Sequence, residues 1–191
     1  IVDTTFAVAS DLHYELQEEE LEWFSEDPIF GYANRRAAME NESRYIVDEF
    51  LNQCAENEKI EFILIPGDIA NEGRAVKQQH LEIVEKFRKF EQETGKQIYV
   101  INGNHDAGKG EKEGETSLEE FREIYYEFGF SEALSTMEGN LSYTADLNEK
   151  YRLIAADSCD INRSTGDGMT EDRVEWVVNE AEKAIAEGKY P

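Results

Sequence analysis

The stretch Phe62–Asp68, which reads FILIPGD, joins a continuous apolar run to a tight turn and a carboxylate. An unbroken apolar run bounded by proline and glycine is typical of a central strand in a parallel sheet, because such a strand is buried on both faces. Gly67 allows the backbone to turn sharply before Asp68 without a clash from a Cβ atom. The stretch therefore predicts a buried strand that ends in a polar turn.

Two further apolar runs end in the same way, one on each side of this stretch along the chain. Thr4–Ser10 predicts a buried strand that leads into Asp11 and His13. Ile98–Ile101 predicts a third buried strand that leads into residues 103–106, which read GNHD. Each of the three predicted strands is thus followed by polar side chains.

Amphipathic helices are predicted between these strands, because apolar residues recur there at helical spacing. One helix covers Arg36–Glu56, and another starts near Val76 and ends at Gly95, a residue type that favours a helix C-terminus. The apolar positions are Ile46, Phe50, Leu51 and Cys54 in the first helix and Val76, Leu81, Val84, Phe87 and Phe90 in the second. We interpret His80 as a packing residue on the face of Val76 and Leu81. The order β-α-β-α-β predicts an α/β fold with three parallel strands and helices that cover the sheet.

The second half of the chain predicts a helix, a pair of strands and a last helix. Ser117–Glu120 resembles a capping box and starts a helix that continues to about residue 128. Leu141–Leu147 and Tyr151–Ala156 predict two adjacent strands joined by a turn. Thr170 caps the last helix. The apolar face predicted for that helix consists of Val174, Val177, Val178, Ala181 and Ile185.

The segment from Tyr14 to about Asn34 has no clear periodicity and is long for a connection within a domain. Segments of this kind often form lids or binding loops. A short acidic helix at Gln17–Phe24 followed by a surface excursion fits the same residues equally well.

Composition and charge limit the classes of function. The formal net charge of −24 argues against a broad nucleic-acid binder, although divalent cations would reverse the potential locally for a small phosphorylated substrate. No apolar run is long enough to span a membrane, and no signal peptide is visible, so both an exported and a cytoplasmic location stay open. Cys54 and Cys159 have neither zinc nor redox spacing and are expected to be free thiols.

The polar residues that follow the three strands predict a metal site. In open α/β sheets, ligands bind beyond the carboxyl ends of the strands, and that edge would gather Asp11, His13, Asp68, Asn104 and His105. Each motif alone also fits an ordinary cap or turn, but three of them after three consecutive strands favour a common site. A mixed Asp, His and Asn ligand set suits Mn, Fe, Zn or Mg and disfavours copper(I) or an iron–sulfur cluster.

The order D-x-H at residues 11–13, G-D at residues 67–68 and G-N-H-D at residues 103–106 resembles the calcineurin-like metallophosphoesterase superfamily. The resemblance extends from about Thr4 to at least Ser158, and the stretch Gly67–Gly73 is more similar to the bacterial phosphodiesterase-type branch than to the protein Ser/Thr phosphatases. It implies a layered α/β sandwich of mixed sheets flanked by helices. We expect residues 1–191 to form a single domain of this type.

The resemblance also implies two divalent metal ions, Mn, Fe or Zn. Asp11 and His13 would bind the first metal, Asp68 would bridge both, and Asn104 would bind the second. A hydroxide between the two metals would attack the phosphorus of a phosphomonoester or phosphodiester.

A proton donor and possible supporting residues follow from the same resemblance. His105 would donate a proton to the leaving oxygen and would be oriented and kept basic by Asp106. Asp157 and Ser158 are similar to an L-D-S element near the pocket, but an ordinary turn after a strand fits them equally well.

The family also uses histidines further along the chain, and this sequence has none after His105. We therefore expect a chain truncated before its last strands and ligand histidines. Partial metal occupancy, weak or no activity of this chain alone, and self-association through an exposed sheet would follow. A non-catalytic binding domain with a decayed metal site is the alternative from another class, and a metal-dependent nuclease is a further one that the charge disfavours.

Overall fold

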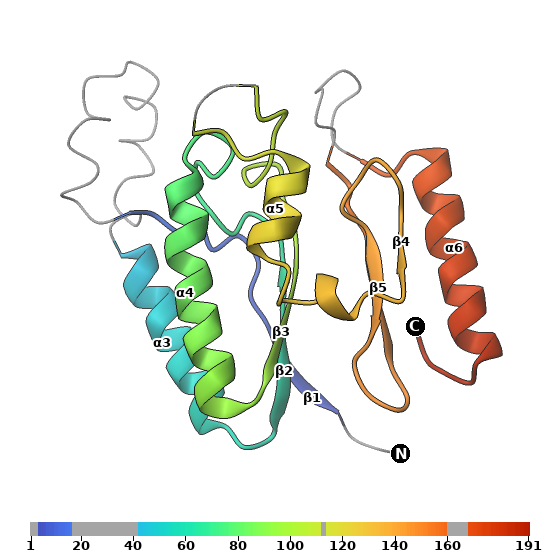
Figure 1. The fold of residues 1–191 in the computed structure, drawn as a ribbon. Coiled ribbons are helices and arrows are strands. Elements are labelled where there is room, and N and C mark those ends of the chain that lie inside the picture. The colour runs from blue at the N-terminus through green and yellow to red at the C-terminus, as the bar shows by residue number, and fades with distance from the viewer. Residues whose placement is uncertain (1–3, 17–41, 112–113, 160–167) are drawn as a thin grey trace.

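The computed structural model describes residues 4–16, 42–111, 114–159 and 168–191. Within these ranges the chain forms two three-stranded sheets between outer layers of helices (Figure 1). The predicted α/β sandwich of mixed sheets flanked by helices is confirmed. The predicted acidic helix Gln17–Phe24 and residues 36–41 of the first predicted helix lie outside the described residues. No helix in the described ranges has both the length and the apolar character needed to cross a membrane.

The first sheet contains the three strands that precede the polar motifs. β1 (Thr5–Val8), β2 (Ile60–Pro66) and β3 (Gln97–Ile101) run parallel in the order β1-β2-β3. Parallel neighbours need crossover connections, and α3 (Ser43–Glu56) and α4 (Lys77–Thr94) lie in these connections and cover one face of the sheet (Figure 1). The prediction of three parallel strands with β2 in the centre is confirmed.

The second sheet is antiparallel. β4 (Ser135–Thr136), β5 (Tyr143–Asp146) and β6 (Arg152–Ala155) lie in the order β4-β5-β6, and α6 (Glu171–Ala186) packs on the outer side of this sheet (Figure 1). The two adjacent strands predicted between residues 141 and 156 are β5 and β6. β4 was not predicted, because a strand of two residues has no periodicity.

Between the two sheets the chain forms α5 (Leu118–Ile124) and a short 3-10 helix, η2 (Phe130–Glu132). The predicted capping box at the start of α5 is confirmed. The Ser117 hydroxyl accepts a hydrogen bond from the Glu120 amide (3.1 Å), and the Glu120 carboxylate accepts one from the Ser117 amide (2.9 Å).

Both sheets share one hydrophobic core. The hydroxyl of Tyr143 in β5 donates to the carbonyl oxygen of Val100 in β3 (2.9 Å). The ring of Tyr143 also packs against that of Phe130, with centroids 4.7 Å apart. The two sheets therefore face each other across a common layer of buried side chains.

The prediction that the first strand is buried is wrong. Phe6 and Val8 are 47% and 54% exposed, whereas Ala7 and Ala9 pack against the core. The reason is that β1 is an edge strand of its sheet, with α3 and α4 packed on one face alone. Phe6 is partly covered on the other face, where its ring stacks on that of Phe62 at a centroid distance of 5.2 Å.

The buried faces of the helices were predicted with a shift of about one residue. Ile46 of α3 and Leu81 of α4 are exposed, whereas Val47 and Ile83 are buried in the core. In α6, Val174, Val178 and Ile185 are exposed. Each residue turns a helix by about 100°, so a small error in phase moves a side chain from the core to solvent. His80 is fully buried in α4, as predicted for a packing residue, but it does not share a buried face with Leu81.

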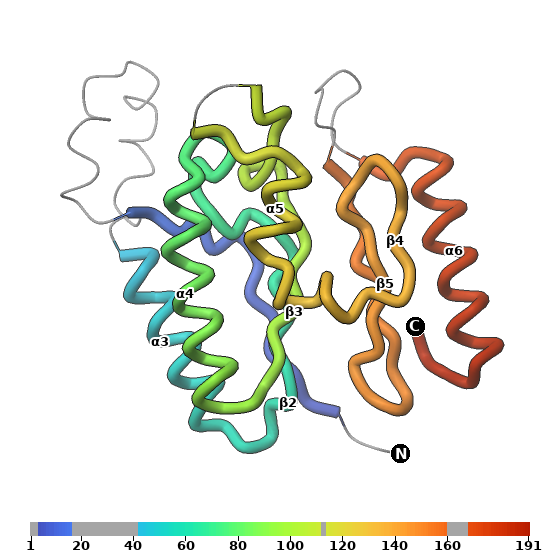
Figure 2. Tube along the Cα trace, in the orientation of Figure 1, coloured from blue at the N-terminus to red at the C-terminus, as the bar shows by residue number. Residues whose placement is uncertain are grey.

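The segments that leave the carboxyl ends of β1, β2 and β3 come together at one edge of the first sheet (Figure 2). This edge carries all three polar motifs. α4 ends at Gly95, just before the start of β3. Gly95 has the left-handed backbone conformation expected of a helix C-cap (φ 69°).

Candidate metal centre

Backbone hydrogen bonds continue the pairing of β1 with β2 into the two loops that follow these strands. The Asp11 amide donates to the carbonyl oxygen of Gly67 (3.1 Å). The His13 amide donates to that of Asp68 (3.0 Å), and the Tyr14 amide to that of Ile69 (2.9 Å). The two loops are therefore joined backbone to backbone, which holds their side chains in a common frame.

Three of the predicted metal ligands meet where these loops are joined. Ligand atoms of Asp11, His13 and Asp68 all lie within 4.8 Å of one another. His13 Nε2 lies 3.9 Å from Asp68 Oδ2. Asp11 is exposed and the other two are half-buried, so the group is open to solvent on one side. Two carboxylates and one imidazole form a ligand set that suits a divalent cation of the Mn, Fe or Zn type.

The backbone is strained at these three residues. Asp11 (φ 57°), His13 (φ 42°) and Asp68 (φ 47°) are the non-glycine residues with positive φ among those the structure describes. A left-handed conformation costs on the order of 1–2 kcal/mol per residue. Strain of this kind is typical of functional sites, where the surrounding structure enforces it. Here the joined loops enforce it, and its coincidence with the three ligands supports a role in metal binding.

Close contact between the loops after β2 and β3 requires glycine. A Cβ atom on Gly103 would lie 2.1 Å from Asp68 Oδ1 and 2.2 Å from the Asp68 amide nitrogen. A Cβ atom on Gly67 would lie 2.7 Å from the Gly103 amide nitrogen. The GD and GNHD motifs therefore touch through their glycines, and this contact brings Asp68 against the third loop.

The third loop contributes Asn104 and His105. Asn104 lines a hollow of about 150 Å³ together with Asp11 and Asp68. The His105 amide donates to Asp68 Oδ1 (3.0 Å), and the His105 ring lies edge-to-face with the His13 ring, at a centroid distance of 4.8 Å. The structure thus brings all five residues of the predicted site to one edge of the sheet.

Asp106 does not orient His105 as expected. His105 Nδ1 instead lies 2.6 Å from the backbone carbonyl oxygen of Asn71. The buried carboxylate of Asp106 accepts hydrogen bonds from the amides of Ala70 (2.9 Å) and Gly103 (2.7 Å). Burial raises the pKa of Asp106 to about 7. Although the two residues are adjacent in sequence, Asp106 points inward and connects the loops after β2 and β3.

His80 supports the same loop from the core. Its Nε2 lies 2.8 Å from the carbonyl oxygen of Asp106, and its Nδ1 lies 2.8 Å from the hydroxyl of Tyr125. A carbonyl oxygen can only accept, so Nε2 carries the hydrogen and Tyr125 donates to Nδ1. Burial lowers the pKa of His80 to about 4, which keeps the ring neutral.

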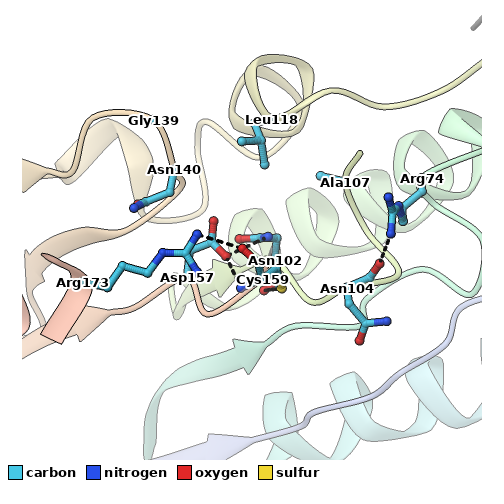
Figure 3. Close-up of a pocket in the computed structure, with 10 residues that line it drawn as sticks. All are labelled: Arg74, Asn102, Asn104, Ala107, Leu118, Gly139, Asn140, Asp157, Cys159 and Arg173. Atoms are coloured by element: carbon cyan, nitrogen blue, oxygen red, sulfur yellow. Dashed lines mark hydrogen bonds between the residues drawn. The ribbon is translucent and has the colours of Figure 1, made fainter. Parts of the chain in front are cut away.

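A second, narrower hollow adjoins the site (Figure 3). Asp157 lies in it, and its Oδ1 accepts hydrogen bonds from the side-chain amide of Asn102 (3.3 Å) and the backbone amide of Cys159 (2.9 Å). Asp157 thus ties the end of β6 to the end of β3. Figure 3 shows Arg74 and Arg173 on opposite sides of this hollow.

Several residues around the site were not predicted from the sequence. Arg74 donates to the carbonyl oxygen of Asn104 (3.3 Å), and Arg173 donates to that of Cys159 (2.8 Å). The buried Glu15, next to the site in sequence, was also missed. No spacing or motif marked these residues, because most of their hydrogen-bond partners are distant in sequence.

Comparison with known proteins gives two matches. Residues 4–184 match the model of the family described as calcineurin-like phosphoesterase. The chain is also similar to the uncharacterized metallophosphoesterase YhaO of Bacillus subtilis (strain 168), with 32% identity over 111 residues. The matched region covers 58% of this chain and 25% of that protein.

Proposed function

The chain belongs to the calcineurin-like phosphoesterase family, and we propose that it hydrolyses small phosphomonoesters or phosphodiesters with two bound divalent metal ions. The family implies metal-dependent phosphoester hydrolysis. The number of metals, their identity as Mn, Fe or Zn, and the type of ester are parts of the proposal.

The observation that carries the proposal is the group of Asp11, His13 and Asp68, whose ligand atoms lie within 4.8 Å of one another on strained backbone. Asp11 and His13 would hold one ion, Asp68 would contact both, and Asn104 would contact the other. Divalent ions in such a site supply Lewis-acid activation of water and of the phosphoryl group.

The protein's own residues orient the site and supply a proton. The His105 amide holds Asp68 through a hydrogen bond of 3.0 Å. The bond from His105 Nδ1 to the carbonyl oxygen of Asn71 leaves Nε2 as the nitrogen that can carry and release a proton. In the proposed reaction this proton goes to the leaving oxygen, the role of a general acid.

The net charge of −24 supports a small substrate rather than nucleic acid. A polyanion would be repelled at long range by the protein surface, whereas a small phosphoester meets a potential dominated by the bound cations.

Metal binding and turnover test the proposal separately. Asp68→Asn removes the charge of the shared ligand with little change in shape. We expect it to weaken Mn(II) binding, measured by calorimetry, by at least about tenfold, the usual effect of disturbing a metal site. Hydrolysis of p-nitrophenyl phosphate and bis-p-nitrophenyl phosphate should be lost as well.

The matched control is Asp172→Asn, which removes a carboxylate from the exposed first turn of α6. It should bind Mn(II) and turn over substrate like the parent protein. Unchanged activity of Asp68→Asn would refute the proposal. Metal binding by the parent protein without turnover of either ester would instead support a non-catalytic binding domain.

A further inference from the structure

Behind the candidate site lies a buried carboxylate, that of Glu15, which is only 3% exposed. Its Oε1 accepts hydrogen bonds from the amide of Leu16 (2.9 Å) and from the side-chain amide of Gln79. Its Oε2 accepts one from the side-chain amide of Asn71 (2.9 Å). Among the described residues, none of the ion pairs includes Glu15. A buried charge is costly unless it is fully hydrogen-bonded, so these N–H donors take the place of a counter-ion.

Asn71 connects this carboxylate to His105. Asn71 is 5% exposed, and its backbone amide donates to the carbonyl oxygen of Tyr14 (3.0 Å). The side-chain amide of Asn71 donates to Glu15, and the backbone carbonyl oxygen of Asn71 lies 2.6 Å from His105 Nδ1. Asn71 is therefore held by hydrogen bonds at its backbone amide and at its side chain. Both bonds restrain the direction in which its backbone carbonyl group points.

The position of the backbone carbonyl group of Asn71 determines the tautomer of His105. A carbonyl oxygen accepts and never donates, so the bond to Asn71 requires a hydrogen on Nδ1. Neutral His105 then has its lone pair on Nε2, and the protonated ring releases its second proton from Nε2. The hydrogen bond made by one ring nitrogen thus decides the chemistry of the other.

We propose that Glu15 is a positioning residue that, through Asn71, holds His105 in the Nδ1–H tautomer needed for proton donation from Nε2. The tautomer itself is a property of the metal-free protein, whereas its consequence for catalysis rests on the function proposed above. Glu15 is not itself a metal ligand in this scheme, because N–H donors occupy both of its oxygens.

Nitrogen-15 NMR of the metal-free protein tests the tautomer directly. The chain has three histidines, so their ring signals can be assigned with single substitutions. We expect His105 to be in the Nδ1–H form in the parent protein. Glu15→Leu removes the carboxylate that accepts from the Asn71 side chain. Asn71→Ala removes the side-chain amide that donates to Glu15 and keeps the backbone carbonyl that bonds His105. Either variant should shift the tautomer ratio about fivefold toward Nε2–H, the effect of weakening one neutral hydrogen bond.

Ser43→Ala is the matched control. It removes the hydroxyl that accepts a hydrogen bond from the backbone amide of Glu15 (3.0 Å) at a buried position, and it leaves the link between Glu15 and Asn71 intact. The tautomer of His105 should not change in this variant. If Asn71→Ala, folded by circular dichroism, keeps the parent tautomer ratio, Glu15 does not act through Asn71 and the proposal is wrong.

Turnover provides a second test that distinguishes positioning from general damage. A poor leaving group needs proton donation more than a good one, so Asn71→Ala should lose about tenfold more kcat on phenyl phosphate than on p-nitrophenyl phosphate. In a His105→Ala background the same substitution should cost nothing further. The proposal would be overturned if Asn71→Ala lowered kcat equally on both esters. It would also be overturned if Asn71→Ala lowered kcat as much in the His105→Ala background as in the parent protein. If the parent protein hydrolyses neither ester, the function proposed above fails, while the tautomer measurement still decides the role of Glu15.

Discussion

Replacing Gly103 with alanine places a methyl group where Asp68 now lies. The new Cβ atom would be 2.1 Å from Asp68 Oδ1, 2.2 Å from the Asp68 amide nitrogen and 2.8 Å from its Cγ. A rotation of the Asp68 side chain could relieve the contact with Oδ1. It could not relieve the contact with the amide nitrogen, because that atom belongs to the backbone.

The size of the effect follows from these distances. Ordinary van der Waals contact begins at 3.4 Å, so the two loops must separate by about 1.2 Å to accommodate the methyl group. Overpacking of this kind costs roughly 1–3 kcal/mol of folding free energy. A displacement of about 1 Å at a catalytic centre lowers activity by about a hundredfold. We therefore expect a folded but destabilised protein with a disrupted metal site.

The assay combines stability, metal affinity and turnover. Urea unfolding of the metal-free variant should show the loss of about 1–3 kcal/mol. Calorimetry with Mn(II) should show weaker binding, and kcat/KM for p-nitrophenyl phosphate should fall by about a hundredfold.

Gly95→Ala is the matched control for Gly103→Ala. A Cβ atom there would have no neighbour within 4 Å, but φ is +69°, so the substitution should cost about 1 kcal/mol without affecting Mn(II) binding. If Gly103→Ala binds Mn(II) and turns over substrate as Gly95→Ala does, the contact between the two loops does not position Asp68.

Further predictions concern stability. Burial lowers the pKa of His80 from 6.5 to about 4, so the unfolded chain binds a proton between these pH values and the native protein does not. Stability should therefore fall as pH decreases from about 6.5 toward 4, by about 3 kcal/mol from this group, and urea unfolding of His80→Gln should lack that component. Ser117→Ala removes the hydroxyl that caps α5 and should cost about 1 kcal/mol in the same assay; a change below the error of the measurement would contradict the capping role.

Much of the fold could be predicted because it depends on local patterns. The apolar run of β2 indicates a strand buried on both faces, and the alternation of strands with helices favours parallel pairing. The caps at Ser117 and Gly95 were predicted for the same reason, since a helix end is stabilised by residues within one turn of it.

Burial was harder to predict, because it depends on neighbours that are distant in sequence. Phe6 and Val8 have the same apolar character as the side chains of β2, yet they are exposed on an edge strand. The helix faces show the same limit. Ile46 and Val47 are adjacent and similar, and only the placement of α3 against the sheet decides that Val47 is the buried one.

For the candidate site, the sequence by itself determined the chemical groups and the edge of the sheet where they gather. Asp11, His13, Asp68 and Asn104 follow strand ends, and the carboxyl ends of parallel strands lie at one edge. Only the tertiary structure decided the partners of these groups. His105 bonds to the carbonyl oxygen of Asn71 rather than to the adjacent Asp106. The physical reason is that a hydrogen bond needs a donor and an acceptor within about 3 Å and well aligned, and turns set that geometry without regard to distance along the chain.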